Sequence, residues 1–416
     1  MQKYSITRAL DLPEYKIIEI VSETDKEIHM RLRAYKRKKA RCSGCGEYHD
    51  GQKIHSFKEV VVEDLRLFEK RVYLHVIKRR YRCVKDGRIY VETVEWLKPR
   101  CRVTNRLAKE IYRLTSITTN QEAGWYLGMN DEKVYRTDKA VLEDLFRERL
   151  ISTPASVNIS VDEVAWKKHH RYLTNVIDTD EKVLTWNEKG RKAEVLNKYY
   201  ESLGEDNCKR IESVALDGAK TYISSTKNYA VNALIVLDRF HATQKANKTM
   251  DRVRLDELNK ARKNKDEELV QLTNCKQRFI LLKNKKNLSD KQSVTLKRLC
   301  EINQPIYKAM LLKESFLQTY ECETIEKAEE HLYRWIDQAL FSGLDSFFEF
   351  ACSVLDKMQY ILNWFKKKIS SAISEGFNNK IKRLKRMAYG YKDIAYFKLK
   401  IHQHCGYLNP RRFHLN

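Results

Sequence analysis

The sequence lacks the features of a membrane or secreted protein. No run approaches the ~18 apolar residues that a membrane-spanning helix needs, and residues 1–17 contain no apolar stretch like that of a signal peptide. Among the 10 cysteines only Cys42 and Cys45 lie close together, which argues against a disulfide framework. We therefore expect a cytoplasmic protein whose cysteines are metal ligands near the N-terminus and buried free thiols elsewhere.

Acidic residues are outnumbered by basic ones. The 416 residues include 80 Lys and Arg against 56 Asp and Glu, which leaves a net charge of +24 and a pI near 9.4. Such an excess favours a polyanionic partner, because neutralising phosphates releases their condensed counterions. Hydrophobic residues make up 42% and exclude global disorder, and the length allows several domains of ~100–200 residues each.

Proline is scarce, and two of the five prolines separate regions of different pattern. Before Pro99, residues 71–76 alternate as a strand does. Between Pro99 and Pro154 the period predicts three short helices, near 104–114, 119–127 and 131–147. From residue 156 the pattern predicts three strands, a helix, a strand, a helix and a strand. After about residue 243 nearly the whole chain is predicted to be helical.

The segment Arg-Cys-Ser-Gly-Cys-Gly at 41–46 is half of a zinc-binding motif. Thiolates of Cys42 and Cys45, two residues apart, can bind one Zn²⁺ in tetrahedral geometry, and Cys83 supplies a third. The position three residues after Cys83 is an aspartate, so the fourth ligand stays open between Asp86, His49, His55 and Cys101. The alternative is a degenerate ribbon that folds without metal.

Two groups of cations beside other motifs are candidates for contact with DNA phosphates. One adjoins the third cysteine and consists of Arg79, Arg80 and Arg82. The other lies in the predicted C-terminal helix and consists of Lys382 and Arg386. Residues 119–147 add a short helix ending at Gly128 and a longer second helix, which is the order of a helix-turn-helix DNA-binding motif. A purely structural helical bundle would show the same pattern.

Carboxylates follow two of the predicted strands. Residues 157–163 form a buried-type strand that ends in Asp162 and Glu163, and residues 211–217 form the fourth strand, which ends in Asp217. This order of elements is that of a ribonuclease H-like fold, in which the first and fourth strands are central neighbours. Two adjacent carboxylates repel each other unless a cation lies between them, and oxygen ligands select Mg²⁺ or Mn²⁺. Asp238, after the fifth strand, and His241 are auxiliary candidates; Asp238 more simply caps the following helix.

The third acid is Glu375, in Ser-Glu-Gly-Phe-Asn-Asn-Lys-Ile-Lys at 374–382. In a helix, Phe377, Ile381 and Leu384 form an apolar stripe, whereas Glu375 shares a polar face with amides and cations. Such a face suits a helix that contacts both a metal ion and a DNA backbone. Its ordinary meaning would be a solvated surface.

Together these residues resemble the ISL3 family of bacterial insertion-sequence transposases of the DDE type. The matching segments span nearly the whole chain: 41–46 with 79–83, 161–163 with 170–172, Asp217 with Tyr222, 238–241, and 374–382 with 388–391. The resemblance implies a zinc ribbon, a helix-turn-helix and a ribonuclease H-like core with an all-helical insertion. The ribbon departs from the family pattern by lacking its usual fourth cysteine.

We therefore predict a multidomain α+β protein. Its parts are a zinc-ribbon-like DNA-binding domain at 1–98, a helix-turn-helix at 99–153, a ribonuclease H-like core at 154–251 and 361–416, and an all-helical insertion at 252–360. The predicted activity is metal-dependent DNA cleavage and strand transfer, with Asp162, Asp217 and Glu375 binding two Mg²⁺ or Mn²⁺ ions. The expected partners are the terminal inverted repeats and target DNA, bound by a homodimer or larger assembly, with no membrane.

Two other functions remain open at this point. A zinc and helix-turn-helix transcription regulator without catalysis explains residues 1–150 equally well, but it gives no reason for three acids at those positions. A ribonuclease H-like nuclease that cleaves DNA without joining it would need the same acids.

Overall fold

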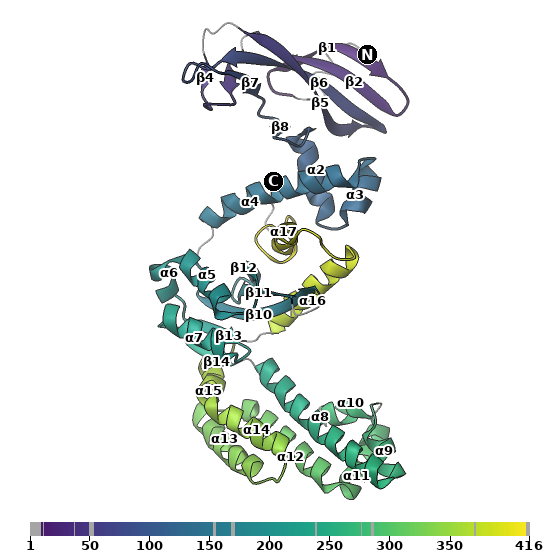
Figure 1. The fold of residues 1–416 in the computed structure, drawn as a ribbon, viewed down its shortest axis with the longest axis vertical. Coiled ribbons are helices and arrows are strands. Elements are labelled where there is room, and N and C mark those ends of the chain that lie inside the picture. The colour runs from purple at the N-terminus through teal and green to yellow at the C-terminus, as the bar shows by residue number, and fades with distance from the viewer. Residues whose placement is uncertain are drawn as a thin grey trace. The chain divides into compact units, whose positions relative to one another are not determined.

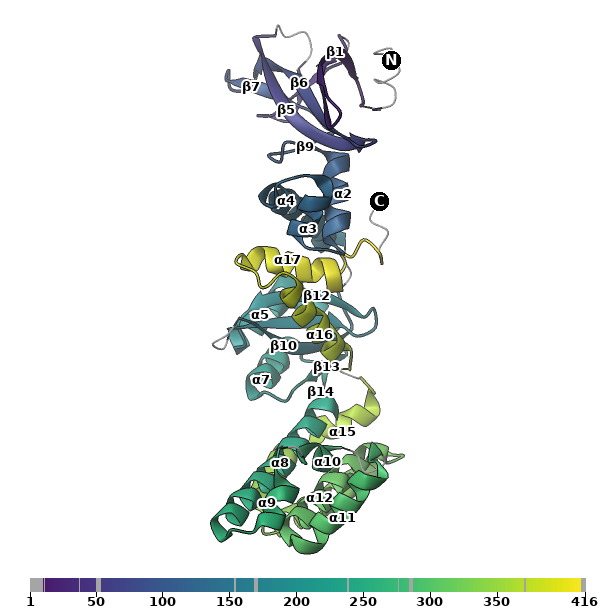
Figure 2. The same ribbon diagram turned by 90° about the vertical axis from the view of Figure 1, so that its right-hand side faces the viewer.

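The chain forms two compact units in a computed structural model, which describes residues 10, 12–36, 38–49, 54–152, 155–167, 171–237, 239–275, 277–283, 287–369 and 372–412. One unit consists of Met1–Thr153 with Tyr391–Asn416, and the other of Pro154–Gly390. Figures 1 and 2 show the elements of each unit from two sides. Among the described residues, none of the helices has the length and apolar character needed to cross a membrane.

The first unit begins with a β-sheet. Its long strands are β1 (Tyr15–Glu23), β2 (Glu27–Ala34), β5 (Ser56–Leu67) and β6 (Lys70–Arg82), and β6 pairs with both β2 and β5. The alternation expected at 71–76 is confirmed, because Val72, Leu74 and Val76 are fully buried. Short strands β3 (Ala40–Cys42), β4 (Tyr48–His49) and β7 (Ile89–Thr93) extend one edge of the sheet, and β8 (Leu97–Lys98) and β9 (Val103–Thr104) extend the other.

Three helices follow within the same unit: α2 (Asn105–Thr115), α3 (Asn120–Leu127) and α4 (Asp131–Ser152), close to the expected positions. Thr119 and Glu122 form a capping box at the start of α3, and Gly128 ends it at φ 66°, a conformation that glycine adopts without strain. The helices share a buried apolar core that includes Ile111 and Val134.

The last helix, α17 (Ile394–Cys405), belongs to this first unit. The fully buried ammonium of Lys400 donates to the carbonyl of Thr115 at 2.6 Å and lies 3.3 Å from the carboxylate of Asp138. Buried polar groups of this kind need their partners, so α17 is tied to α2 and α4. The expected last part of the core, residues 361–416, is therefore divided between the two units at Gly390.

The second unit contains a mixed five-stranded sheet in the order β12-β11-β10-β13-β14. The strands are β10 (Asn158–Lys167), β11 (Arg171–Asp178), β12 (Val183–Lys189), β13 (Ser213–Leu216) and β14 (Leu234–Leu237). β10 is antiparallel to β11 and parallel to β13. Helices α5 (Ala193–Leu203), α6 (Glu205–Lys209) and α7 (Lys220–Tyr229) pack on the face that carries Ile159 and Val161.

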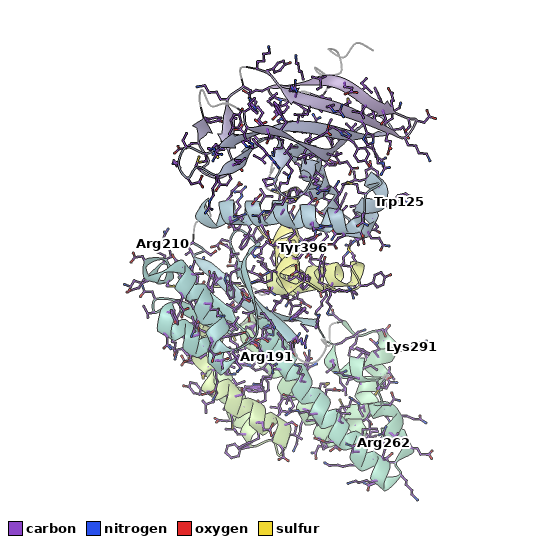
Figure 3. The ribbon with its side chains drawn as sticks, turned by 45° about the horizontal axis from the view of Figure 1, so that its top comes forward. Trp125, Arg191, Arg210, Arg262, Lys291 and Tyr396 are labelled. Atoms are coloured by element: carbon purple, nitrogen blue, oxygen red, sulfur yellow. The ribbon has the colours of Figure 1, made fainter. Side chains whose placement is uncertain are left out.

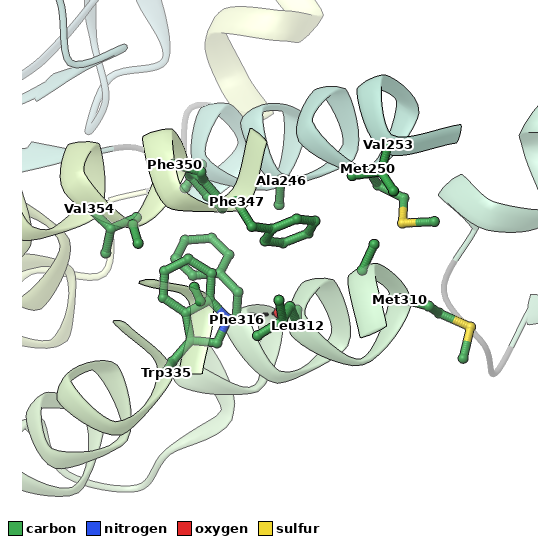
Figure 4. Packing of buried hydrophobic residues seen from close by; sticks show 14 of the residues in the cluster. Ala246, Met250, Val253, Met310, Leu312, Phe316, Trp335, Phe347, Phe350 and Val354 are labelled. Carbon is green, nitrogen blue, oxygen red and sulfur yellow. Dashed lines mark hydrogen bonds between the residues drawn. The ribbon is translucent and has the colours of Figure 1, made fainter. Parts of the chain in front are cut away.

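Helices make up the rest of the second unit. They are α8 (Arg239–Asn264), α9 (Glu267–Thr273), α10 (Arg278–Leu282), α11 (Asp290–Ile302), α12 (Gln304–Gln318), α13 (Ile325–Leu340), α14 (Asp345–Asp356), α15 (Met358–Lys366) and α16 (Ala372–Met387). Phe316, Trp335 and Phe350 fill the centre of the helical core, and the Trp335 indole donates to the carbonyl of Leu312 at 2.7 Å (Figure 4). This core is anchored to the sheet where the Asn363 amide donates to the β14 carbonyl of Ile235 at 2.8 Å.

Candidate active site and zinc-binding site

The first two acids come together through the pairing of β10 with β13. The register of these parallel strands places Ser160 beside Ala215. Two residues further along stand Asp162, in β10, and Asp217, directly after the end of β13. The charge of Asp217 acts on the Asp162 carboxyl, so the two acids are near each other. Because side chains alternate between the faces of a sheet, the Asp162 carboxylate points to the face of Ser160. That face is covered by α16, whose Ser374 hydroxyl lies 2.7 Å from the Ser160 hydroxyl.

Asp162 is surrounded by groups that act on its charge. The Asn378 amide of α16 donates to Oδ2 of Asp162 at 2.7 Å, and the backbone N–H of Glu163 donates to Oδ1 at 2.7 Å. Nε2 of His241 lies 4.0 Å from Oδ1. Burial raises the pKa of the Asp162 carboxyl, and the charge of Asp217 raises it further, against these hydrogen bonds and the imidazole. A cation between the two carboxylates would remove this cost.

Glu375 lies in the first turn of α16 and is exposed. The apolar stripe of this helix packs inward as expected, with Phe377, Ile381 and Leu384 buried. Residues three apart in a helix are neighbours on its surface, so Glu375 shares a flank with Asn378, which contacts Asp162. Within the described residues, oxygen atoms taken one from each of the three acids do not all lie within 4.8 Å of one another.

Glu163 contributes more to this region than its sequence position suggests. It faces the opposite side of β10 from Asp162, where the Tyr222 hydroxyl donates to its Oε1 at 2.8 Å and lies 2.9 Å from the Thr174 hydroxyl. Burial raises the pKa of the Glu163 carboxyl, and the charge of Asp217 acts in the same direction. The sequence analysis assigned no role to Glu163, which directly follows Asp162. Asp238 lies outside the described residues.

The cysteine motif forms a preassembled cluster in the first unit. The sulfur atoms of Cys42, Cys45 and Cys83 all lie within 4.8 Å of one another, and Cys42 and Cys83 are buried. The backbone N–H of Gly44 also donates to the Cys42 sulfur at 3.4 Å. Three thiolates at this spacing fit a tetrahedral Zn²⁺ ion, which would hold them together through zinc–sulfur bonds of ~2.3 Å.

Two similar turns build this cluster. In one, the Gly46 N–H donates to the Cys42 carbonyl at 3.0 Å; in the other, the Gly87 N–H donates to the Cys83 carbonyl at 2.9 Å. Both glycines have positive φ, at 77° and 69°. Cys45 lies three residues after Cys42, and Asp86 lies three residues after Cys83. Asp86 thus occupies the position equivalent to a cysteine ligand.

The Asp86 carboxylate is held beside the cluster by two donors. It accepts from the Arg88 N–H at 3.0 Å and from the Tyr90 hydroxyl at 2.8 Å, and these bonds lower its pKa. The Tyr90 ring also lies over Gly44, where a Cβ atom would come within 2.6 Å of it. Within the described residues, the cluster includes neither Asp86 nor Cys101 nor His55; the side chain of His49 lies outside the described residues.

Comparison with known proteins identifies the family. Residues 159–401 match a family model of ISL3 transposases, and residues 38–85 match one described as the zinc-finger of transposase IS204/IS1001/IS1096/IS1165. The chain is 32% identical over 361 residues to the transposase for insertion sequence element IS1001 of Bordetella parapertussis, covering 86% of this chain and 87% of that protein. The chain belongs to the ISL3 transposase family. It is also 28% identical over 254 residues to the transposase for insertion sequence element IS1557 of Mycobacterium tuberculosis, covering 56% of each.

Membership in a transposase family implies binding of DNA. The cations that are expected to contact phosphates differ in how exposed they are. Lys382 and Arg386 are exposed on α16, and Arg82 is exposed at the end of β6. Arg79 is instead buried, with its guanidinium donating to the Glu92 carboxylate at 2.6 and 2.9 Å. We therefore leave Arg79 out of the DNA-binding surface. The alternating pattern of β6 did not predict this burial, because Glu92, the ion partner of Arg79, lies in another strand.

The helices after Pro99, which carry the expected helix-turn-helix, are covered in one place and exposed in another. Tyr135 and Lys139, on the second helix of the expected helix-turn-helix, both donate to the Asp393 carboxylate at 2.7 Å. That part of α4 is therefore occupied by the segment leading into α17. Trp125 of α3 is 84% exposed, and Figure 3 shows it at the surface of the helical part of this unit. Trp125 is thus free to contact a partner.

Proposed function

We propose that this transposase cleaves and joins DNA in a ribonuclease H-like core, with Asp162, Asp217 and Glu375 as its catalytic acids. The observation that carries the proposal is the register of β10 and β13, which juxtaposes two carboxylates beside a helix that bears the third. Three antiparallel strands followed by two parallel ones, with helices on both faces, support the assignment of this fold.

The donor set fits hard divalent cations. Asp162 and Asp217 offer oxygen ligands, and burial, together with the charge of Asp217, raises the pKa of Asp162, so a bound cation would favour its charged form. Mg²⁺ or Mn²⁺ bound by the three acids would activate the attacking water or DNA 3′ hydroxyl and stabilise the leaving oxygen. Asn378 would keep the Asp162 carboxylate oriented, and His241 would lie close to the reacting phosphate.

Glu163 and Tyr222 act in this proposal as positioning residues. Their hydrogen bond ties β10 to α7, which follows Asp217 in the chain. The bond therefore fixes the two strand ends that present the first two acids. Neither side chain needs to contact DNA.

In the first unit we propose one structural Zn²⁺ ion bound by Cys42, Cys45 and Cys83, with Asp86 as the fourth ligand. The equivalence of the two turns supports Asp86 over the other candidates. We further propose that α3 and α4 form a helix-turn-helix, that the first unit recognises the inverted repeats, and that at least two copies of the chain act together on DNA.

A cleavage and joining assay tests the catalytic proposal. Purified protein would be incubated with a duplex carrying an end of the insertion sequence, with a target duplex, and with Mg²⁺, Mn²⁺ or EDTA. We expect cleavage at the end and strand transfer only with a divalent ion. Cleavage without joining under all conditions would leave a nuclease, and sequence-specific binding without cleavage would leave a regulator.

A further inference from the structure

A cationic cavity adjoins Asp217 on the side of the helical region. Its volume is about 320 Å³, and besides Asp217 it is lined entirely by residues of α8. Four of these side chains can carry a positive charge: His241, Lys245, Lys248 and Arg252. The residues follow at spacings of four, three and four, so they form a single row.

Two lysines meet at the active-site end of this row. Lys357, between α14 and α15, lines a small adjoining cavity together with Asp217 and Lys245. Burial lowers the pKa of the Lys245 ammonium, and the charge of Lys357 lowers it further. The Lys245 ammonium donates to the Ser353 hydroxyl at 2.5 Å. Within the described part of the chain, neither lysine forms an ion pair with a carboxylate.

The backbone beside Asp217 makes room for this arrangement. Gly218 has φ 85°, and a Cβ atom there would lie 3.3 Å from the Lys357 ammonium and 2.6 Å from Leu237. A side chain at this position would therefore collide with Leu237 and crowd the Lys357 ammonium. The Asp-Gly sequence thus allows a lysine from the helical region to reach the second catalytic acid.

Two ammonium groups held close together, with no carboxylate of the described residues at ion-pair distance, favour a bound anion. Asp217 alone does not account for them, because the proposed function assigns its charge to a divalent ion. A phosphate matches their chemistry, since lysine binds phosphate as a point charge. The row from His241 to Arg252 spans 12 residues, about 16 Å of helix from the first to the last. Phosphates of one B-DNA strand follow at ~3.4 Å along the axis, so the row spans several of them.

We propose that Lys245 and Lys357 bind a backbone phosphate of the DNA strand next to the cleavage site, and that Lys248 and Arg252 continue this track along α8. The helical region thereby supplies a phosphate-binding site to the active site. The proposal rests on the proposed catalytic function. The phosphate belongs either to the DNA that flanks the element or to the target DNA, and these sources act in different steps.

Single-turnover assays of the full-length protein separate the two steps. The variants are Lys245→Gln, Lys357→Gln and their combination, with Lys263→Gln as the control, an exposed lysine on α8 outside both cavities. Cleavage uses an element end with flanking DNA, and joining uses a precleaved end with a target duplex. Loss of one charge-assisted hydrogen bond predicts about a 10- to 100-fold slower step. Slower cleavage assigns the phosphate to the flank, and slower joining assigns it to the target.

A neutral methylphosphonate placed at successive positions near the cleavage site locates the contact. At the contacted position it should slow the unmodified enzyme but not further slow the double variant. Thermal unfolding and the Lys245→Arg and Lys357→Arg variants, expected to restore the rate, exclude a loss of fold. The inference is overturned if both Gln variants match Lys263→Gln in both steps. If Asp217→Asn cleaved normally, the proposed catalytic function would fail instead, whatever the lysine variants do.

Discussion

The two candidate metal sites of this chain are built in opposite ways. The cysteine site comes from two similar turns, and its three sulfurs already lie within 4.8 Å of one another. The carboxylate site takes one ligand from each of three elements, and its third acid, Glu375, is exposed on a helix flank. A site closed by local turns serves a structural ion, which must stay bound. A site open to solvent leaves room for DNA and for the ions that act on it.

The two sites also differ in the structure that surrounds their ligands. Cys42, in β3, and Cys83, directly after β6, are buried where β3, β4 and β7 extend the edge of the sheet, so bound zinc would hold these segments together. Asp162 is held by Asn378 within a unit that has its own extensive core. We therefore expect loss of metal to unfold the first site locally but to leave the second folded and inactive.

The largest effect is expected at the carboxylates. Replacing Asp162, Asp217 or Glu375 singly with Ala removes a proposed ligand of the catalytic ions. Because bound metal stabilises the transition state by several kcal/mol, cleavage should fall by on the order of 10³-fold or more. Single-turnover cleavage of an element end measures the rate, and gel-shift titration should show that DNA binding persists.

Glu163→Gln is the informative control for these acids. It keeps the volume of a carboxyl group that faces Tyr222 and Asp217 from the other side of β10. As a positioning residue it should reduce cleavage by less than any of the three acids does. If the Asp217 variant kept full activity and the Glu163→Gln protein were folded but inactive, Glu163 would replace Asp217 as the second ligand.

Removal of zinc should have the next largest effect. Chelation, or Cys83→Ser, is expected to release about one zinc ion per chain and to unfold the turns at 41–46 and 82–88, because thiolate ligation couples metal binding to local folding. Metal analysis measures the ion, and hydrogen exchange measures the strands. Cys275→Ser, at an exposed cysteine, is the control. Unchanged exchange in zinc-free protein would show that the ribbon folds without metal.

Sequence patterns indicate candidate ligands for both sites where those ligands are close together in the chain or follow a recognisable strand. Cys42 and Cys45 are two residues apart, and the acids follow strands whose apolar runs are plain in the sequence. The strands from β10 to β14 and the helices α2 to α4 fall close to the expected ranges, because their periodicity reflects burial. Residues 361–416 were expected in one part, but Lys400 draws α17 to α2 and α4.

What the sequence did not predict are contacts between distant elements. Asn378 was placed on a polar helix face, but nothing local showed that it would bind Asp162, 216 residues away. Arg79 lies in a run of cations that is typical of an exposed surface, yet it is buried and paired with Glu92. Lys245 and Lys357 come together because α8 packs against α14, which ends directly before Lys357. Such pairs depend on tertiary packing, which periodicity does not encode.

A smaller effect is expected from the fourth zinc ligand. Asp86→Cys would complete a four-thiolate site, so we expect tighter zinc binding, whereas Asp86→Ala should weaken it, each by about tenfold or more. Competition with a chromogenic chelator measures the affinity. Glu47→Ala is the matched control, since it removes an exposed carboxylate of the same ribbon that pairs with Lys85. An Asp86→Ala protein that binds zinc as the control does would place the fourth ligand elsewhere.

The smallest effect concerns how the two units share DNA binding. Lys382 and Arg386 are exposed on α16 and would contact phosphates, which position a protein without specifying sequence. The variant Lys382→Gln/Arg386→Gln should therefore weaken binding several-fold and equally on repeat and scrambled duplexes. Its slope of log K against log salt should fall by roughly 0.9 per lost contact. Lys209→Gln/Arg210→Gln, at the exposed end of α6 (Figure 3), controls for net charge.

Zinc removal should change DNA binding in the opposite pattern, by abolishing the preference for the repeat while leaving the affinity for scrambled DNA nearly unchanged. These titrations need the whole chain, because a fragment of residues 1–150 would lack α17 and leave Asp138 without its Lys400 and Tyr396 partners. If the α16 variant instead lost the preference for the repeat and the zinc-free protein kept it, recognition would belong to the catalytic unit. The cysteine site would then stabilise a domain that does not read sequence.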